Sequence, residues 1–541
     1  MPTATEARAE ARTEAGTDAA GTTGLLRLNL RRDRILLPVW IWLLTAMVAA
    51  SAFATTGLYT DAAERVAASR VINTSPALVA LYGPILNEHS AAELAMSKMT
   101  VMYALFVMGL GLVVVRRHTR VEEESGRAEL MGATLVGRSA PLRAALLEAA
   151  AAAVVLGVLC MVVDVAAGLE VAGSVAFGLS WTGAALVGAG TGAVCAQLAA
   201  SARTCGGLAL ATFAVWDVIR AAGDIGPDAL GWLSPLGWGT RLDAWGDTRW
   251  WVLGLYAALA AVLVVAAHVL RGRRDLGNGL LAEGAGPADG QIGSTLALVW
   301  RLNRLSTAWW LVASLVSGAL FGSVAPHIGS LFDSPAGKAA LEALGGKGRV
   351  EDAMLAALLA VMAAILSAYA VQVTVSGARE ETDGRTPEVL AATGSRAQVF
   401  GAQVLVAGAG LAALAVAYGA GSAIGYGSQV GGVGDALGRL VPAALAHVPA
   451  MWVVAAVAVL AWAWSPHQPW IGWAALVAFV TLGEVGPLLE LPDWVIGLSP
   501  FQHVVAVPVQ PVDVSSEVGL VVAATLLLAV AFGRYRARDI G

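Results

Sequence analysis

The chain is 541 residues long, and 57% of its residues are hydrophobic whereas only 13% are charged, which gives a mean hydropathy of +0.70. Soluble proteins are about one-quarter charged, so this composition excludes a soluble enzyme or a nucleic-acid-binding protein and indicates a membrane protein in contact with lipids. The net charge of −5 says little about partners, because it adds up two faces on opposite sides of a membrane.

The N-terminal part of the chain precedes the first apolar run. Residues 1–23 are rich in alanine, threonine and glutamate without apolar periodicity, so we expect a disordered cytoplasmic tail. Residues 25–34 mix leucines with arginines, as residues 296–304 do later in the chain. Such segments lie in the membrane interface with arginines at the headgroups. We therefore predict an interfacial elbow helix at each of the two places.

Long apolar runs fill most of the remaining chain. A membrane span needs about 20 apolar residues, and about six such runs occur in each half of the chain. In the first half they lie near residues 36–58, 99–115, 142–166, 172–200, 205–222 and 250–270. In the second half they lie near residues 305–325, 353–375, 398–420, 438–464, 469–486 and 516–533. Because helices satisfy their own backbone in lipid, we predict an all-α polytopic membrane protein with about 12 transmembrane helices.

Four unrelated motifs occur twice, at separations between 258 and 270 residues. The pairs are Gly126-Arg127 with Gly384-Arg385, Leu233-Ser234-Pro235 with Leu498-Ser499-Pro500, Arg274-Asp275-Leu276-Gly277 with Arg538-Asp539-Ile540-Gly541, and Arg31 and Arg34 with Arg301 and Arg304. A nearly constant separation indicates duplication of a whole module. We predict two parallel six-helix repeats, residues 24–276 and 294–541, joined by a Gly/Ala-rich cytoplasmic linker at 277–293.

The arginine and lysine residues set the orientation. Most of them fall on the segments that face the cytoplasm if the chain starts inside and crosses the membrane at each span. This bias places both termini in the cytoplasm. The segments 223–249 and 487–515, before the last span of each half, then lie outside; they are rich in tryptophan, proline and glycine, so we expect short re-entrant or interfacial helices there.

A charged segment joins the second and third spans of each half, at residues 116–143 and 377–396. In both copies acidic residues flank a Gly-Arg step, where the glycine lets a short polar helix turn. The candidate coupling residues are Glu122, Glu123, Gly126, Arg127, Glu129, Glu380, Glu381, Gly384, Arg385 and Glu388. A loop whose charges only set the topology is the alternative, but it would not need the same residues twice. We therefore favour a docking element for a second protein.

These motifs, in this order and duplicated, resemble the permeases of ABC-2-type exporters, and more narrowly the actinobacterial tetronasin or polyketide-antibiotic exporter permeases with two fused six-span halves. The resemblance runs from about residue 25 to residue 541. It implies an export permease for hydrophobic drugs, antibiotics or lipid-like compounds. It also implies that two copies of a separately encoded ATPase, a homodimer, bind ATP and Mg and dock on the coupling segments.

Catalytic and cofactor-binding motifs are missing from the sequence. The G-x-x-x-x-G-K-[ST] phosphate loop does not occur, and the seven histidines never pair at metal-ligand spacing, so we expect packed histidines and neither metal nor cofactor on this chain. Cys160, Cys195 and Cys205 fall in or beside apolar runs and indicate small-residue packing. We expect no catalysis by the chain alone.

Apolar stripes and ionisable residues in the spans are candidates for the transport pathway. The candidates are Met99, Met102, Phe106, Met354, Met362, Tyr369, Asp217 and Arg220. Methionine and aromatic faces adapt to irregular apolar ligands, although core packing explains such stripes equally well. Asp217 and Arg220 stand three residues apart, where they can neutralise each other or contact substrate.

Two other classes of protein remain open. A secondary transporter with six spans in each half works without an ATPase and can carry a charged loop between its second and third spans. A membrane glycosyltransferase needs an acidic catalytic motif in an outer loop, and Asp61, Glu64 and Asp228 do not form one convincingly.

Overall fold

The computed structural model describes residues 20–59, 61–132, 136–275, 277–281, 293–326, 347–393, 395–468, 470–484 and 491–539. Most of the predicted tail and linker lie outside these residues, as do Leu276, Ile540 and Gly541 of the repeated motif. The described part contains α-helices and a short 3-10 helix but no strand. It divides into two compact units, residues 1–285 and 286–541, and each is considered by itself.

The described residues include 11 helices that are long and apolar enough to cross a membrane. In the first unit these are Leu36–Gly57, Met102–Glu124, Ala140–Ala166, Val171–Leu198, Ala202–Ile225 and Val252–Gly272. In the second unit they are Thr295–Val324, Val350–Thr382, Arg396–Val430, Val433–Trp464 and Val514–Ala537, and the shorter apolar helix Trp470–Gly483 lies at the predicted run 469–486. The prediction of an all-α polytopic membrane protein with about 12 spans is therefore confirmed.

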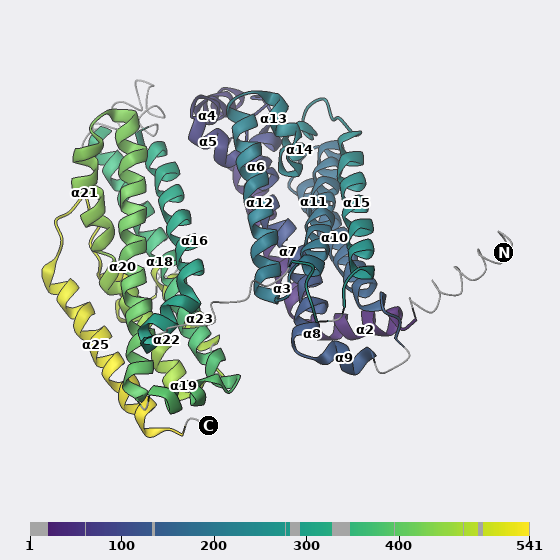
Figure 1. Cartoon of the computed structure of the whole chain (residues 1–541). Coiled ribbons are helices and arrows are strands. Elements are labelled where there is room, and N and C mark those ends of the chain that lie inside the picture. Colours follow the sequence, from purple (N-terminus) through teal and green to yellow (C-terminus); the bar gives the residue numbers. More distant parts are fainter. Residues whose placement is uncertain are drawn as a thin grey trace. The chain divides into compact units, whose positions relative to one another are not determined.

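The first unit is a bundle of long helices with short helices at both ends (Figure 1). Its helices are α2 (Thr22–Arg32), α3 (Leu36–Leu58), α4 (Ala62–Thr74), α5 (Pro76–Tyr82), α6 (Ala91–Thr100), α7 (Met102–His118), α8 (Arg120–Glu124), α9 (Arg127–Gly132), α10 (Ala140–Ala166), α11 (Val171–Leu198), α12 (Ala202–Ile225), α13 (Asp228–Trp232), α14 (Pro235–Arg241) and α15 (Val252–Gly272). The central helix is α11, which packs against α7, α10 and α15. Helices α2, α8 and α9 gather at one end of the bundle, and α4, α5 and α13 lie at the other.

The second unit repeats this plan. Its helices are α16 (Thr295–Val324), α18 (Lys347–Thr382), α19 (Arg385–Thr393), α20 (Arg396–Val430), α21 (Val433–Leu445), α22 (Val448–Trp464), α23 (Trp470–Glu484), α24 (Asp493–Ile496), the 3-10 helix η3 (Pro500–His503) and α25 (Val514–Ala537). Helix α19 lies at the same end of this unit as the end of α25 that carries the C-terminus (Figure 1). Short broken helices also occupy both predicted outer segments, as α13 and α14 in the first unit and as α24 and η3 in the second.

Close helix crossings hold the second unit together. A β-carbon added at Gly421 of α20 would lie 2.1 Å from the backbone oxygen of Leu315 on α16, and one at Gly425 would lie 2.0 Å from that of Ala319. Glycines four residues apart let two backbones approach without side chains between them, which is how helices associate in lipid, where burial from water gives no driving force. The pairing of α16 with α20 therefore depends on these glycines.

Two features of the fold differ from the prediction. The second elbow is no separate helix, because residues 296–304 continue into α16. In the first unit the chain leaves the helix at Asp33, whose carboxylate contacts Arg117 and His118 on α7. The matching Asn303 donates a 2.9 Å hydrogen bond to the backbone oxygen of Val299 in its own helix. A side chain bonded within the helix leaves it straight.

The other difference concerns the segment between the first two spans. Three short helices, α4 to α6, fill residues that the prediction had left without structure. The second apolar run is interrupted at Val101, which separates α6 from α7. All three cysteines of the chain lie among the described residues, and Cys160, Cys195 and Cys205 are buried free thiols.

Candidate functional site

The predicted turn between the second and third spans is present in both units. Gly126 separates α8 from α9 with φ +73°, and Gly384 separates α18 from α19 with φ +75°. Nothing lies within 4 Å of a β-carbon added at either glycine, so backbone conformation and not space requires the residue. Residues other than glycine rarely adopt this left-handed conformation. The repeated Gly-Arg step thus encodes a repeated turn.

Behind the turn of the first unit lie three residues, Glu123, Arg138 and Arg274, that we call the first junction; the ion pair between Glu123 and Arg274 is buried. The two outer nitrogens of Arg274 each donate to one oxygen of Glu123 at 2.7 Å, a bidentate arrangement. Arg138 then donates to the backbone oxygen of Arg274 at 2.7 Å. Paired forks of this kind fix geometry as well as charge. The junction therefore joins the turn, the start of α10 and the residues just after α15.

Further cations surround Glu123, whose side chain is only 4% exposed. Arg120 lies 2.9 Å and Arg271 lies 3.5 Å from its carboxylate. Arg120 also donates to the backbone oxygen of Gly277 at 2.7 Å, so part of its donor capacity is used on the chain beyond α15. The fourth long helix contributes Gln197, which accepts a 2.8 Å hydrogen bond from Arg274. A buried carboxylate is stable here because every neighbour supplies positive charge.

The second unit holds the matching second junction, made by Glu381, Arg396 and Arg538. Arg538 lies 2.5 Å from the carboxylate of Glu381, whose side chain is 7% exposed. Arg396 donates to the backbone oxygen of Arg538 at 2.6 Å. Trp462 of α22 donates a 3.0 Å hydrogen bond to Glu381. Three repeated positions thus meet in both units. In the second unit, 157 residues separate the two charged partners.

The neighbouring acids, Glu122 and Glu380, have different surroundings. Glu122 is buried, and Arg32 at the end of α2 donates to it at 2.7 Å, a hydrogen bond that raises the pKa of Arg32. Glu380 pairs at 2.6 Å with Arg385, which is 53% exposed, and this bond raises the pKa of Arg385. The first acid therefore ties the elbow helix to the turn, whereas the second forms a surface pair.

The exposed faces of the turn lie on α9 and α19. Leu130 is 74% exposed, and Arg127, Glu129 and Glu388 are also exposed. The predicted coupling residues therefore form two groups. Glu122, Glu123 and Glu381 are bound within the chain and position the turn, whereas the exposed residues are available to a partner.

The structure separates the predicted transport candidates. Met99 is buried in α6, whereas Phe106 on α7 is 54% exposed, and the interruption at Val101 lies between them, so the predicted stripe is not one helical face. Met362 and Tyr369 are both buried on α18, and the Tyr369 hydroxyl lies 3.0 Å from that of Thr307. These two side chains belong to the core of the second unit.

Three other candidates, Met354, Asp217 and Arg220, lie elsewhere. Met354, near the start of α18, is partly exposed. Arg220 pairs with Asp217 at 2.6 Å, as predicted, and with Asp224 at 3.3 Å; Asp224 also bonds Arg241 at 3.1 Å. The sequence reasoning missed Asp224 and Arg241, because the network spans α12 and α14 and its members share no repeated spacing. Arg220 is buried and its charge is balanced within the chain.

These observations define a multi-pass α-helical membrane protein built from two related units with the same buried junction. Residues 292–536 match the family model described as "Multidrug efflux system permease Rv1217c, C-terminal domain". The chain is 38% identical over 493 residues to the multidrug efflux system permease protein Rv1217c of Mycobacterium tuberculosis (strain ATCC 25618 / H37Rv), which covers 90% of each protein. The chain belongs to this family of efflux permeases.

Proposed function

We propose that the chain is the permease subunit of an ATP-driven exporter of the ABC-2 type. It works with two copies of a separately encoded ATPase, which bind ATP and Mg, and it moves hydrophobic drugs, antibiotics or lipid-like compounds out of the cell. The Rv1217c relative is named a multidrug efflux system permease, which supports drug efflux by this chain. The observation that carries the ATPase partnership is the duplicated turn with a buried junction behind it.

A docking element for a motor protein needs an exposed face on a rigid base. In the first unit the exposed face comprises Arg127, Glu129 and Leu130 on α9. The base is the first junction, where the side chains of the bidentate pair Glu123 and Arg274 are only 4% and 3% exposed. Buried charge pairs resist separation strongly, because removing one partner leaves the other uncompensated. The turn therefore moves together with the helices that the junction joins.

Through the junction, a force applied at the turn can also be transmitted to the membrane-spanning helices. Glu123 and Glu381 lie at the ends of the second spans of their units, whereas Arg274 and Arg538 follow the last spans. A displacement of α9 or α19 is thus passed to two spans at once. This arrangement suits a transporter that is opened by a partner, because packed elements transmit discrete shifts.

Duplication supports a partner with two equivalent parts. The turn glycines share their backbone conformation, and each junction repeats the same acid, the same arginine and the same second arginine. A homodimeric ATPase offers two copies of one surface, so each copy finds one turn. The unequal surroundings of Glu122 and Glu380 make the two dockings different in strength.

The test is reconstitution with the separately encoded ATPase that the proposal requires. We expect no ATP hydrolysis by the permease alone and ATP-dependent uptake of a hydrophobic dye into inverted vesicles when both proteins are present. Reversing both exposed acids, with Glu129→Arg and Glu388→Arg, should lower co-purification of the ATPase at least about tenfold by removing attractive contacts at its rim. Glu88→Arg, at the other end of the first unit, is the matched control and should leave co-purification unchanged.

Two results would contradict the proposal. Vanadate-sensitive ATP hydrolysis by the highly purified chain alone would show that this chain, and not a separate subunit, carries the ATPase activity. Dye transport that needs a proton gradient and proceeds without ATP would identify a secondary transporter instead.

A further inference from the structure

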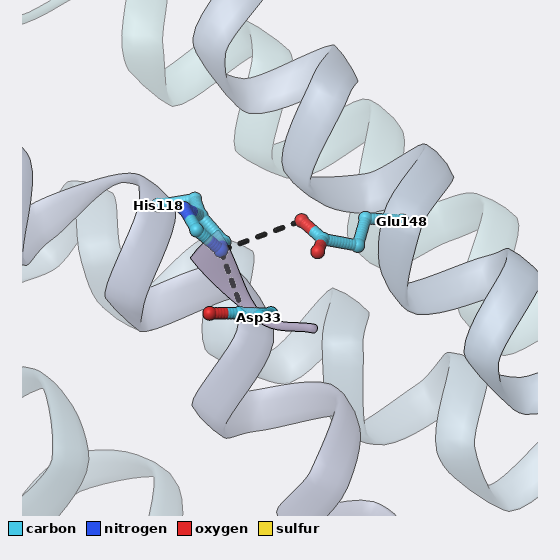
Figure 2. Close-up of side chains that lie close together, drawn as sticks. All are labelled: Asp33, His118 and Glu148. Carbon is cyan, nitrogen blue, oxygen red and sulfur yellow. Dashed lines mark hydrogen bonds and ion pairs between the residues drawn. The ribbon is translucent and has the colours of Figure 1, made fainter. Parts of the chain in front are cut away.

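Three ligand-type side chains from three elements meet at the end of the first unit where α2 lies, in a group that we call the elbow cluster (Figure 2). Asp33 follows α2, His118 ends α7 and Glu148 lies on α10. The Nε2 atom of His118 is 2.8 Å from an oxygen of Asp33 and 3.4 Å from an oxygen of Glu148. Figure 2 shows the imidazole reaching between the two carboxylates.

Glu148 is the member that ordinary packing leaves unexplained. Its side chain is 0% exposed, and neither oxygen accepts a hydrogen bond of normal geometry, although Asn29 lies beside it. A buried carboxylate that lacks well-placed donors carries a large desolvation cost. Figure 2 shows that this carboxylate is directed at His118 and hence into the cluster. A ligand at this point would satisfy it.

The charge balance of the elbow cluster also favours a bound cation. The cluster holds two carboxylates, and Arg117, 2.8 Å from the second oxygen of Asp33, supplies one positive charge. Arg32 is already engaged with Glu122. One more positive charge is needed, and a proton on Glu148 or on the imidazole, or a metal ion, can provide it. The cluster also lies at the C-terminal end of α7, where the helix dipole favours a cation.

We propose that Asp33, His118 and Glu148 bind a divalent transition-metal ion of the zinc class, with His118 Nε2 and one oxygen from each carboxylate as ligands. Tetrahedral zinc sites use histidine nitrogen and carboxylate oxygen at about 2.0–2.2 Å, which places neighbouring ligand atoms about 3.3 Å apart. The 3.4 Å pair already has this separation, and the 2.8 Å pair needs a shift of about half an ångström. Three protein ligands leave a fourth position for water.

A small cavity borders His118 of the cluster. The cavity has a volume of about 50 Å³ and is lined by His118, Glu122, Pro141 and Arg271, among others. That volume holds at least one water molecule, which needs roughly 10–15 Å³ of such space. Water there can also bond the free Nδ1 atom of His118, which has no partner within the described residues. Metal-binding histidines need such an orienting bond on their second nitrogen.

The bound ion would fix the elbow helix to the bundle. Asp33 comes from the segment between α2 and α3, so its coordination ties that bend to α7 and α10. The second unit has no counterpart, because the matching positions of the repeat carry Asn303, Ser376 and Val406. The site is therefore a property of one half of the molecule and independent of the exporter mechanism proposed above.

The experiment is a titration of the full-length protein, purified with a tag that contains no histidine and stripped with a chelator. Co²⁺ reports the site, because its visible absorption depends on coordination geometry and Zn²⁺ displaces it. We expect one equivalent of Co²⁺ to bind, with loss of the absorption on adding Zn²⁺, and Zn²⁺ to raise the unfolding temperature. His118→Gln, Asp33→Asn and Glu148→Gln should each weaken Co²⁺ binding at least about tenfold.

His447→Gln is the matched control, since His447 is buried in the second unit and bonds only the backbone oxygen of Ala443 in its helix. It should bind Co²⁺ as the natural chain does. Absence of saturable Co²⁺ binding to the natural chain overturns the proposal and assigns the missing charge to a proton on Glu148 or His118. That measurement decides the question even where a variant does not fold. Equal binding by His118→Gln also overturns it.

Discussion

The first and second junctions keep the same acid and the same two arginines, but they use different means to stabilise the acid. Around Glu123 the neighbours are further cations, Arg120 and Arg271. The matching positions of the second unit hold Ala378 and Tyr535, and Glu381 is held by Arg538 and by the indole of Trp462. What stays constant is the connection between the turn and the last span; its surroundings have diverged.

The elbow shows the opposite behaviour. Asp33 contacts α7 and the chain bends there, whereas Asn303 bonds its own helix, which continues straight. The junction is present in both units, whereas the first unit bends at Asp33 and the second continues as one helix at Asn303. The comparison teaches that the two halves share a buried connection between the turn and the last span but are not interchangeable.

The largest expected effect tests the two junction acids. Glu123→Gln leaves three buried arginines facing a neutral amide, so we expect a loss of about 3–5 kcal/mol in the free energy of unfolding. Glu381→Gln faces one arginine and keeps an acceptor for Trp462, so we expect a loss of about 2 kcal/mol. Unfolding in detergent, followed by tryptophan fluorescence, measures both. Equal losses would show that the extra cations around Glu123 contribute nothing, and exposed Glu129→Gln serves as the control.

A smaller loss in the free energy of unfolding is expected at the two turns, and it should be the same at both. Gly126→Ala and Gly384→Ala each place a β-carbon in the left-handed conformation, at a cost of about 1–2 kcal/mol. The φ angles of the two glycines differ by only 2°, from +73° to +75°, so the two losses should agree. Gly401→Ala, at an open helical position of α20, should be neutral or slightly stabilising. Unequal losses at Gly126 and Gly384 would mean that the turns bear different strain.

The smallest effect concerns the surface pair of the second unit. Glu380→Gln removes a partner from Arg385, which is 53% exposed. We therefore expect the free energy of unfolding to fall by at most about 1 kcal/mol, and by less at high salt, which screens the pair. Glu122→Gln breaks a buried contact with Arg32, and we expect about 1.5–3 kcal/mol with little dependence on salt. A salt titration of unfolding separates the two. A large, salt-insensitive effect of Glu380→Gln would make the two halves alike at this position.

Much of the fold can be predicted from the sequence, because the lengths of the apolar runs and the duplicated motifs are both visible in the order of the residues. The duplicated motifs also contained both partners of each junction. Their pairing was hidden, since Glu123 and Arg274 lie 151 residues apart and only packing brings them together. The helices α4 to α6 were missed because their residues lack a long apolar run.

The elbow cluster illustrates a different limit. Its members come from three segments, so His118 shows no metal-ligand spacing with Asp33 or Glu148 in the sequence. Two signals were present nonetheless. Asp33 replaces the asparagine of the other repeat, and Glu148 stands alone among alanines and leucines of an apolar run. An acid at such a place is rarely without a partner.

The three buried thiols have a practical consequence for following the transport cycle. Cys160, Cys195 and Cys205 are shielded from aqueous reagents, so a maleimide probe should leave them unmodified in the folded protein. Cysteines introduced at the exposed positions Leu130 and Glu388 can then be labelled selectively, without first removing the native ones. Spin labels on that pair would report how the separation between α9 and α19 changes as nucleotide and partner are added.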